Sequence, residues 1–88
     1  MNRRDVWENI LWRRDVFARD GYACQVCGKD RGGDLVAHHL DSWADFPESR
    51  FDINNGVTLC ETCHKAFHRT YGFGGNTLAQ FESWQQMR

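Results

Sequence analysis

Two C-x-x-C pairs place the strongest constraint on what this chain can fold into: Cys24 with Cys27, and Cys60 with Cys63, separated by residues 28–59. Two such pairs supply four thiolates, a ligand set typical of tetrahedral zinc sites. Zinc has no redox chemistry, and four protein ligands leave no open coordination position, so the predicted zinc is structural. A redox dithiol is the alternative use, but the surrounding β-α-β pattern is absent and a second pair would be unexplained.

The composition also favours a stabilising metal. Only 18 of the 88 residues are Leu, Ile, Val or Phe, close to the roughly 20% below which chains often stay disordered. Short chains with thin cores usually depend on disulfides or a metal. The N-terminal segment lacks the apolar stretch of a signal peptide, and no run approaches the ~20 apolar residues of a membrane span. We therefore expect a cytoplasmic protein, in which metal binding is favoured over disulfides.

Charge is distributed unevenly along the chain. Residues 1–27 carry five basic and four acidic side chains, residues 28–61 three and seven, and residues 62–88 three and one. This is not the uniformly basic profile of a protein that binds nucleic acid by charge alone. Contacts with a phosphate backbone would have to come from local clusters and a bound cation.

The N-terminal segment has the pattern of an amphipathic helix over residues 5–19. Asp5 and Glu8 have the spacing of a capping box, and Asp20-Gly21 would end the helix. The predicted buried stripe consists of Val6, Ile10 and Phe17.

The rest of the chain predicts two short strands and two helices. The strands fall at residues 35–40 and 57–59, with a loop over 41–52 and a turn signal at Asn55-Gly56. One helix is expected over 60–69, and a second begins with a capping box at Thr77 and ends near Gln86. The glycine-rich stretch 71–76, which contains Phe73, is interpreted as a connector.

Four histidines lie between residues 38 and 68. His64 and His68 are four residues apart on the predicted helix, so both imidazoles lie on one face and are close enough to share a metal. His38 and His39 are adjacent on a predicted strand, so their side chains point to opposite faces. A single histidine would more often be a packed or surface residue; four in this arrangement indicate a second, catalytic centre.

The order of these motifs resembles the HNH endonucleases of the four-cysteine type, which are common as compact phage-encoded and homing nucleases. The resemblance rests on C-x-x-C, AHHL at 37–40, Asn55-Gly56 and LC-x-x-CH-x-x-x-H at 59–68, and it covers residues 14–70. It implies an α+β fold: a small ββα-metal, treble-clef-like domain with a four-cysteine zinc site. We expect a single nuclease domain over 1–88, with its core motif at about 20–70 and flanking helices at about 5–19 and 77–86.

The resemblance also implies a role for each catalytic position. His39 matches the general base that activates the attacking water, and His38 matches a metal-ligand position. Asn55 matches the middle letter of the motif, which orients the loop carrying the base in some members and contacts the metal in others. His64 matches the final histidine, and His68 the additional metal ligand of the colicin-like members. One divalent cation is expected there: Mg²⁺, Mn²⁺, Ni²⁺, Co²⁺ or Zn²⁺.

The expected function is metal-dependent hydrolysis of DNA phosphodiester bonds, by nicking or double-strand cleavage. Lys65 and Arg69 flank the metal helix and are the candidate DNA contacts, while Trp43 is interpreted as a cover for the small core. The expected partners are DNA, no membrane, and either a second copy of the chain or phage packaging proteins. A phage-encoded member would act in the bacterial host cytoplasm. The alternative is a non-catalytic zinc module that binds nucleic acid or protein.

Overall fold

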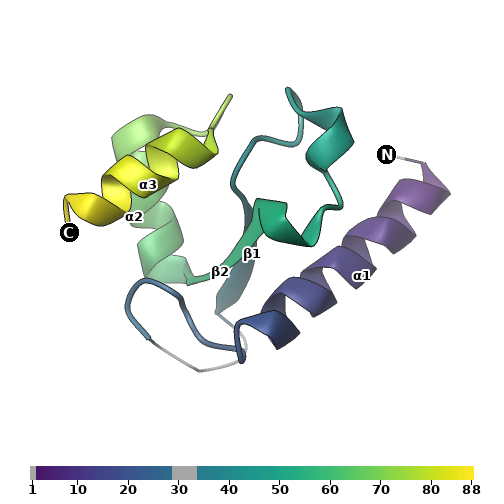
Figure 1. Ribbon diagram of the computed structural model, residues 1–88, viewed down its shortest axis with the longest axis horizontal. Coiled ribbons are helices and arrows are strands. Elements are labelled where there is room, and N and C mark those ends of the chain that lie inside the picture. The colour runs from purple at the N-terminus through teal and green to yellow at the C-terminus, as the bar shows by residue number, and fades with distance from the viewer. Residues whose placement is uncertain (1, 29–33) are drawn as a thin grey trace.

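The computed structural model describes residues 2–28 and 34–88; residue 1 and residues 29–33, which fall within the expected domain, lie outside the described residues. The elements follow in the order α1 (Arg3–Arg19), β1 (Leu35–His39), the short 3-10 helices η1 (Pro47–Ser49) and η2 (Ile53–Asn55), β2 (Gly56–Cys60), α2 (Glu61–Tyr71) and α3 (Leu78–Gln86). Figure 1 shows the two strands between α1 on one side and the α2–α3 pair on the other. The expected small α+β fold is confirmed.

The strands form an antiparallel hairpin that leads directly into α2. Leu35 pairs with Cys60 at one end, and His39 pairs with Gly56 at the other. Cys60 ends β2 and is also the N-cap of α2, where its sulfur accepts a hydrogen bond from the Cys63 backbone N–H. The β1–β2–α2 unit is therefore the ββα arrangement that the resemblance implied.

The main core lies between β2, α2 and α3. Phe67 of α2 and Leu59 of β2 are fully buried. The Phe67 ring lies 5.8 Å from the ring of Phe81 and 5.6 Å from that of Trp84, both on α3. Since aromatic pairs at these distances add to area burial, α3 supplies much of the bulk that the aliphatic residues lack.

Helix α1 packs on the hairpin through Trp12 and Val16, which are buried. A Cβ atom on Gly56 would lie 2.5 Å from the Trp12 ring and 2.6 Å from the Val16 side chain, so only glycine allows this close approach. The predicted stripe is wrong, because Val6 and Ile10 are exposed and Phe17 is only half-buried. Figure 1 shows that the C-terminal end of α1 lies beside the strands, whereas its N-terminal part extends past them.

The predicted capping boxes had opposite outcomes. Helix α1 begins two residues earlier than expected, because Asn2 accepts a hydrogen bond from the Asp5 backbone N–H at 2.8 Å. Asn is as good an N-cap as Asp, and Glu8 pairs with Arg4 instead. The box at Thr77 and Gln80 is confirmed, with both reciprocal hydrogen bonds present.

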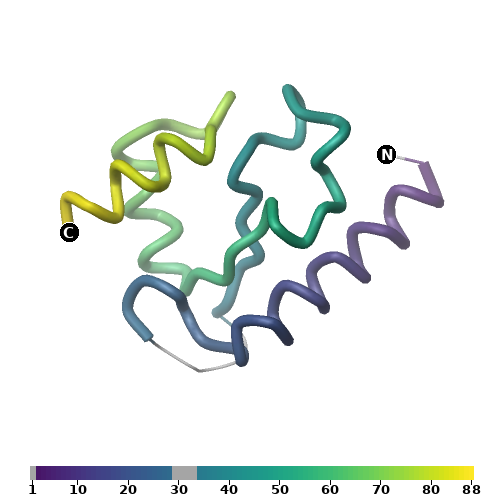
Figure 2. The backbone as a smooth tube through the Cα atoms, viewed as in Figure 1, coloured from purple at the N-terminus to yellow at the C-terminus, as the bar shows by residue number. Residues whose placement is uncertain are grey.

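The loop between β1 and β2 and the segment between α2 and α3 extend to the same end of the molecule (Figure 2). They are joined there by a hydrogen bond from the Ser42 backbone N–H to the Asn76 carbonyl, at 2.9 Å. Among the described residues, no helix is both long and apolar enough to cross a membrane.

Candidate metal centres and active site

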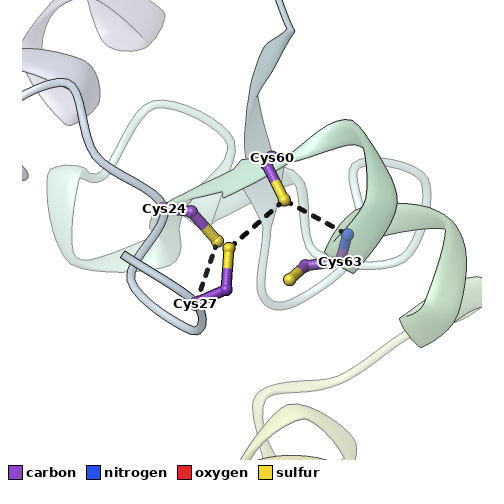
Figure 3. A group of neighbouring side chains, drawn as sticks. All are labelled: Cys24, Cys27, Cys60 and Cys63. Carbon is purple, nitrogen blue, oxygen red and sulfur yellow. Dashed lines mark hydrogen bonds between the residues drawn. The ribbon is translucent and has the colours of Figure 1, made fainter. Parts of the chain in front are cut away.

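The four cysteines lie together, as Figure 3 shows. Their sulfur atoms are all within 4.8 Å of one another, and no disulfide joins them. The Cys27 and Cys60 sulfurs are 3.6 Å apart. In a tetrahedral site with Zn–S bonds of ~2.3 Å, neighbouring sulfurs lie ~3.8 Å apart. The cluster therefore suits structural zinc.

Backbone N–H groups support this cluster from both sides. The Cys27 N–H points to the Cys24 sulfur at 3.5 Å, and the Cys63 N–H to the Cys60 sulfur at 3.4 Å. Burial raises the pKa of Cys24, but hydrogen bonds, chiefly from backbone N–H groups, outweigh burial and lower that pKa to about 6. Burial and the neighbouring sulfurs raise the pKa of Cys63. The Cys24 thiol thus ionises more easily than a free thiol, while Cys63 needs a nearby cation to ionise.

The cluster also joins parts of the chain that are far apart in sequence. The first pair sits on a turn after α1, closed by a hydrogen bond from the Gly28 N–H to the Cys24 carbonyl, with Gly28 at φ +80°. The Gln25 N–H donates to the Thr58 carbonyl at 2.9 Å and so attaches this turn to β2. Zinc here would hold the turn, the hairpin and the start of α2 in one unit.

A second potential metal centre is formed by three histidines. The ring nitrogens of His38, His64 and His68 lie within 4.8 Å of one another. His38 comes from β1 and faces α2, with ring centroids 5.3 Å from His64 and 5.5 Å from His68. His64 and His68 of α2 therefore lie close to one strand histidine, His38, as the sequence pattern indicated.

The protonation pattern of this group suits a cation. His68 donates its Nδ1–H to the Gly72 carbonyl at 2.8 Å, because a carbonyl can only accept. The Nε2 atom of His68 therefore carries a lone pair, and it lies 2.9 Å from His64 Nε2. His38 Nε2 is buried and has no hydrogen-bond partner among the described residues. Such an orphaned nitrogen in a polar cluster fits a metal ligand.

Burial favours the neutral form of His38 and His64. Burial, with the nearby His64 and His68, lowers the pKa of His38 to about 3. Burial also lowers the pKa of His64, with a further contribution from His68. Neutral imidazole is the form that binds divalent metals.

His39 has different surroundings on the other face of the strand. Its ring stacks on Trp12 of α1, with centroids 3.9 Å apart and an interplanar angle of 13°. Its Nε2–H donates to the Arg50 carbonyl at 2.9 Å, so Nδ1 carries the free lone pair. Burial and the charge of Arg50 lower the pKa of His39, although the hydrogen bond to Arg50 opposes them.

All four histidines line one cleft of about 270 Å³. The cleft lies between the loop after β1, which contributes Trp43, and the segment after α2, which contributes Phe73. A strand that directs neighbouring side chains to opposite faces can still present both to one cleft here, because His38 and His39 are at the end of β1.

Asn55 does not line this cleft. Its side chain is buried, accepts a hydrogen bond from the Asp41 N–H at 2.8 Å, and donates to the carbonyls of Asp41 and Ser49 at 3.0 and 3.1 Å. It thus ties both ends of the 41–52 loop to the end of the hairpin. Arg50, whose carbonyl holds His39, belongs to the same loop.

The two expected DNA contacts are exposed residues of α2. Lys65 pairs with Glu61 at 2.7 Å, and neither Lys65 nor Arg69 lines the cleft. Phe73 was interpreted as part of a connector, yet its ring stacks on His68 at 4.2 Å. Trp43 is half-buried as expected, but it covers His39 rather than the main core.

Comparison with known proteins gave one family and one relative. The family model described as HNH endonuclease matches residues 24–70. A protein of Nostoc sp. (strain PCC 7120 / SAG 25.82 / UTEX 2576) named Anaredoxin is 28% identical over 69 residues, which cover 78% of this chain and 87% of that protein. No solved structure gave a significant match.

Proposed function

Because the chain belongs to the HNH endonuclease family, we propose that it is a metal-dependent DNA endonuclease that hydrolyses phosphodiester bonds. The observation that carries the proposal is a pairing within one cleft: three imidazoles able to hold a cation, and a fourth whose free nitrogen is fixed by its hydrogen bond. A four-cysteine zinc site alone would require none of these histidines.

His39 is the proposed general base. Its Nε2–H is held by the Arg50 carbonyl and its ring is held by Trp12, so Nδ1 is free to accept a proton from the attacking water. The water oxygen forms a bond to phosphorus while the bond to the leaving 3′ oxygen breaks, and that oxygen then takes up a proton. A positioned base of this kind contributes roughly 10²- to 10⁴-fold in rate.

His38, His64 and His68 are the proposed ligands of the catalytic cation. A divalent cation held there would supply Lewis-acid stabilisation of charge on a phosphate oxygen and on the leaving oxygen. The Gly72 carbonyl orients His68, as carbonyl groups commonly orient metal-binding imidazoles. Imidazole ligands favour Zn²⁺, Ni²⁺, Co²⁺ or Mn²⁺, while Mg²⁺ prefers more oxygen ligands.

Asn55 is the proposed positioning residue of the base. Both ends of its amide are occupied by backbone groups of the 41–52 loop. That loop supplies the Arg50 carbonyl which holds His39. Of the two roles that the family offers for this position, these contacts favour orientation of the loop over contact with the metal.

Lys65 and Arg69 of α2 are the proposed DNA contacts. Arg69 and Lys65 lie outside the cleft on the helix that carries His64 and His68. A phosphate group would have to displace Glu61 from Lys65, and exposed ion pairs of this kind are weak enough for that.

The first prediction concerns His39→Ala. Conversion of supercoiled plasmid to the nicked form, in the presence of Mn²⁺, is expected to fall by roughly 10²- to 10⁴-fold. Zinc content and the thermal melt provide the control, because loss of the Trp12 stack must be separated from loss of the base. His39→Gln is the matched variant: its amide can still donate to the Arg50 carbonyl but cannot accept a proton. Equal cleavage by the parent and either variant would remove His39 from this role.

A second candidate function is a non-catalytic zinc module that binds nucleic acid or protein. The relative named Anaredoxin favours it, because that name does not describe a nuclease. This candidate accounts for the four cysteines but gives no reason for the three-histidine cluster. It predicts that the parent leaves supercoiled plasmid intact with every divalent cation tested.

A further inference from the structure

Phe73 is the most exposed large apolar side chain of the described residues, at 80% of its surface. Its ring nevertheless has a fixed neighbour: it stacks on His68 with centroids 4.2 Å apart and an interplanar angle of 14°. One face of Phe73 therefore lies on a proposed metal ligand, while its other face is open. The side chain also lines the cleft that holds all four histidines.

The backbone around Phe73 is tied to the same centre. The Gly72 carbonyl accepts hydrogen bonds from His68 Nδ1 at 2.8 Å and from Asn76 Nδ2 at 3.2 Å. The Asn76 carbonyl in turn accepts from the Ser42 N–H across the cleft. Hydrogen bonds at Gly72 and Asn76 thus fix the short segment that contains Phe73. The exposed ring of Phe73 is therefore carried by a backbone that is tied to the rest of the fold.

The other aromatic residue of the cleft is already occupied. The guanidinium of Arg50 lies 4.5 Å from the centre of the Trp43 ring, and the rings of His39 and Phe51 meet Trp43 edge to face at 5.6 and 5.4 Å. Phe73 is therefore the aromatic ring of the cleft that offers an open face.

Charge alone would bind DNA weakly at this cleft. None of the described residues that line it is Lys or Arg, and the chain has a net charge of −1. Phosphate contacts usually supply most of the sequence-independent affinity for DNA. Stacking of bases on aromatic side chains is the other general source, and it does not depend on sequence.

Resting on the proposed nuclease function, we propose that Phe73 stacks on a nucleobase next to the scissile phosphate, and that the substrate is DNA whose bases are unpaired there. In a continuous duplex both faces of each base are covered by neighbouring bases, so an aromatic side chain can stack only after a base has been unstacked at a cost of a few kcal/mol. A single strand, flap or mismatch presents an open base face without that cost. Phe73 is a specificity-determining residue, and His39 remains the base.

The test compares binding of a labelled oligonucleotide as a single strand and as a blunt duplex of the same sequence, by fluorescence anisotropy. The His39→Ala protein with its zinc is used, so that cleavage does not consume the probe. We expect tighter binding of the single strand, and a loss of about fivefold or more of that affinity in Phe73→Leu. Duplex affinity should not change, and Phe73→Trp should restore the preference. Trp7→Leu is the matched control, because Trp7 is 61% exposed on α1 and lies outside the cleft.

Cleavage of the same two DNA forms by proteins with an intact His39 distinguishes a failure of the Phe73 inference from a failure of the proposed nuclease function. A merely structural role of Phe73 would lower cleavage of both forms equally, and an unchanged ratio between them in Phe73→Leu overturns the inference while leaving the nuclease function intact. The inference is also overturned if the His39→Ala protein that retains Phe73 binds the single strand and the duplex equally well. Failure of the parent to cleave any DNA overturns the proposed function and, with it, this inference about its substrate.

Discussion

The chemically important side chains of this chain are held mainly by backbone groups. His39 is held by the Arg50 carbonyl, His68 by the Gly72 carbonyl, and Asn55 by the backbone of Asp41 and Ser49. Backbone partners leave few alternative arrangements, since they move only with the fold. In a chain with little core this allows imidazole orientations to be specified without a large supporting shell of side chains.

Asp20 is the clearest case of a charged side chain used in this way. It follows the last residue of α1, pairs with Arg19, and accepts a hydrogen bond from the Thr58 N–H of β2 at 2.9 Å. Burial raises the pKa of Asp20, but the hydrogen bonds from Arg19 and Thr58 outweigh it, so that pKa lies below its ordinary value. The carboxylate therefore stabilises the folded state above the unfolded pKa of about 3.9, and this stability is lost as the pH falls through the folded pKa.

We predict that Asp20→Asn lowers the free energy of unfolding by about 1.5–3 kcal/mol, the range for a hydrogen bond to a charged group. Urea unfolding should give the same difference from the parent at pH 7 and pH 5, since both lie above the unfolded pKa. Asp15→Asn is the control: Asp15 also pairs with a neighbouring arginine, at 3.2 Å, but its side chain is 50% exposed. If Asp20→Asn cost no more than Asp15→Asn, the link from α1 to β2 would not be stabilising.

Among the elements, α2 contributes to both metal centres. Its N-cap is Cys60 and its first turn contains Cys63; His64 directly follows Cys63, and His68 lies one turn further on. The hairpin brings His38 to the same helix, because β2 runs directly into α2 without a loop. A single strand-to-helix junction thus sets the distance between the zinc cluster and the histidine cluster.

How far the elements could be predicted depended on how local their signals were. The C-x-x-C pairs, the His64–His68 spacing and the Thr77 capping box are set by neighbours within four residues, and each agrees with the structure. The buried face of α1 is not local. Trp12 and Val16 are the buried residues of α1 because they lie where the helix meets the hairpin. The periodicity of the α1 sequence does not show that the helix extends past the hairpin.

The same limit applies to the site. Strand alternation and helix spacing indicated that one of His38 and His39 faces α2, and the family resemblance implied that it is His38. The contacts of Asn55 depend on the path of the 41–52 loop, and the stack of Phe73 on His68 depends on the chain reversal after α2. Loop paths of this kind have no repeating pattern in sequence. A large aromatic residue between glycines, five residues after a candidate metal ligand, was the one available signal.

For the whole molecule, zinc bound at the four-cysteine cluster would offset the thin hydrophobic core. The cluster joins the turn after α1, the hairpin and α2. The free energy of zinc binding to such sites is largely free energy of folding, about 10–16 kcal/mol in zinc-finger peptides. That is as large as the whole stability of a typical domain.

We predict that Cys60→Ser unfolds the chain. Ser is a good N-cap residue, so the variant keeps the capping hydrogen bond of α2 and removes the thiolate. Circular dichroism should show no cooperative melt, and metal analysis should show less than one zinc per chain. The parent should lose its melt on chelation and regain it when zinc is added. A cooperative melt in Cys60→Ser would mean that zinc does not hold the fold together.

We propose that the three histidines hold the cation on which DNA cleavage depends, so the cation dependence of plasmid nicking is a direct test of their role. The rate at which supercoiled plasmid is nicked should be measured against Mn²⁺ concentration for the parent and for His64→Ala. This variant removes one ligand at a half-buried helical position where Ala is well tolerated. We predict that the nicking rate of the parent rises with Mn²⁺ concentration and saturates. The His64→Ala variant should need at least roughly tenfold more Mn²⁺ to reach half of its maximal rate, or should be inactive. The proposal would be contradicted if the parent left both the plasmid and a single-stranded oligonucleotide intact at every concentration, or if both proteins had the same Mn²⁺ dependence.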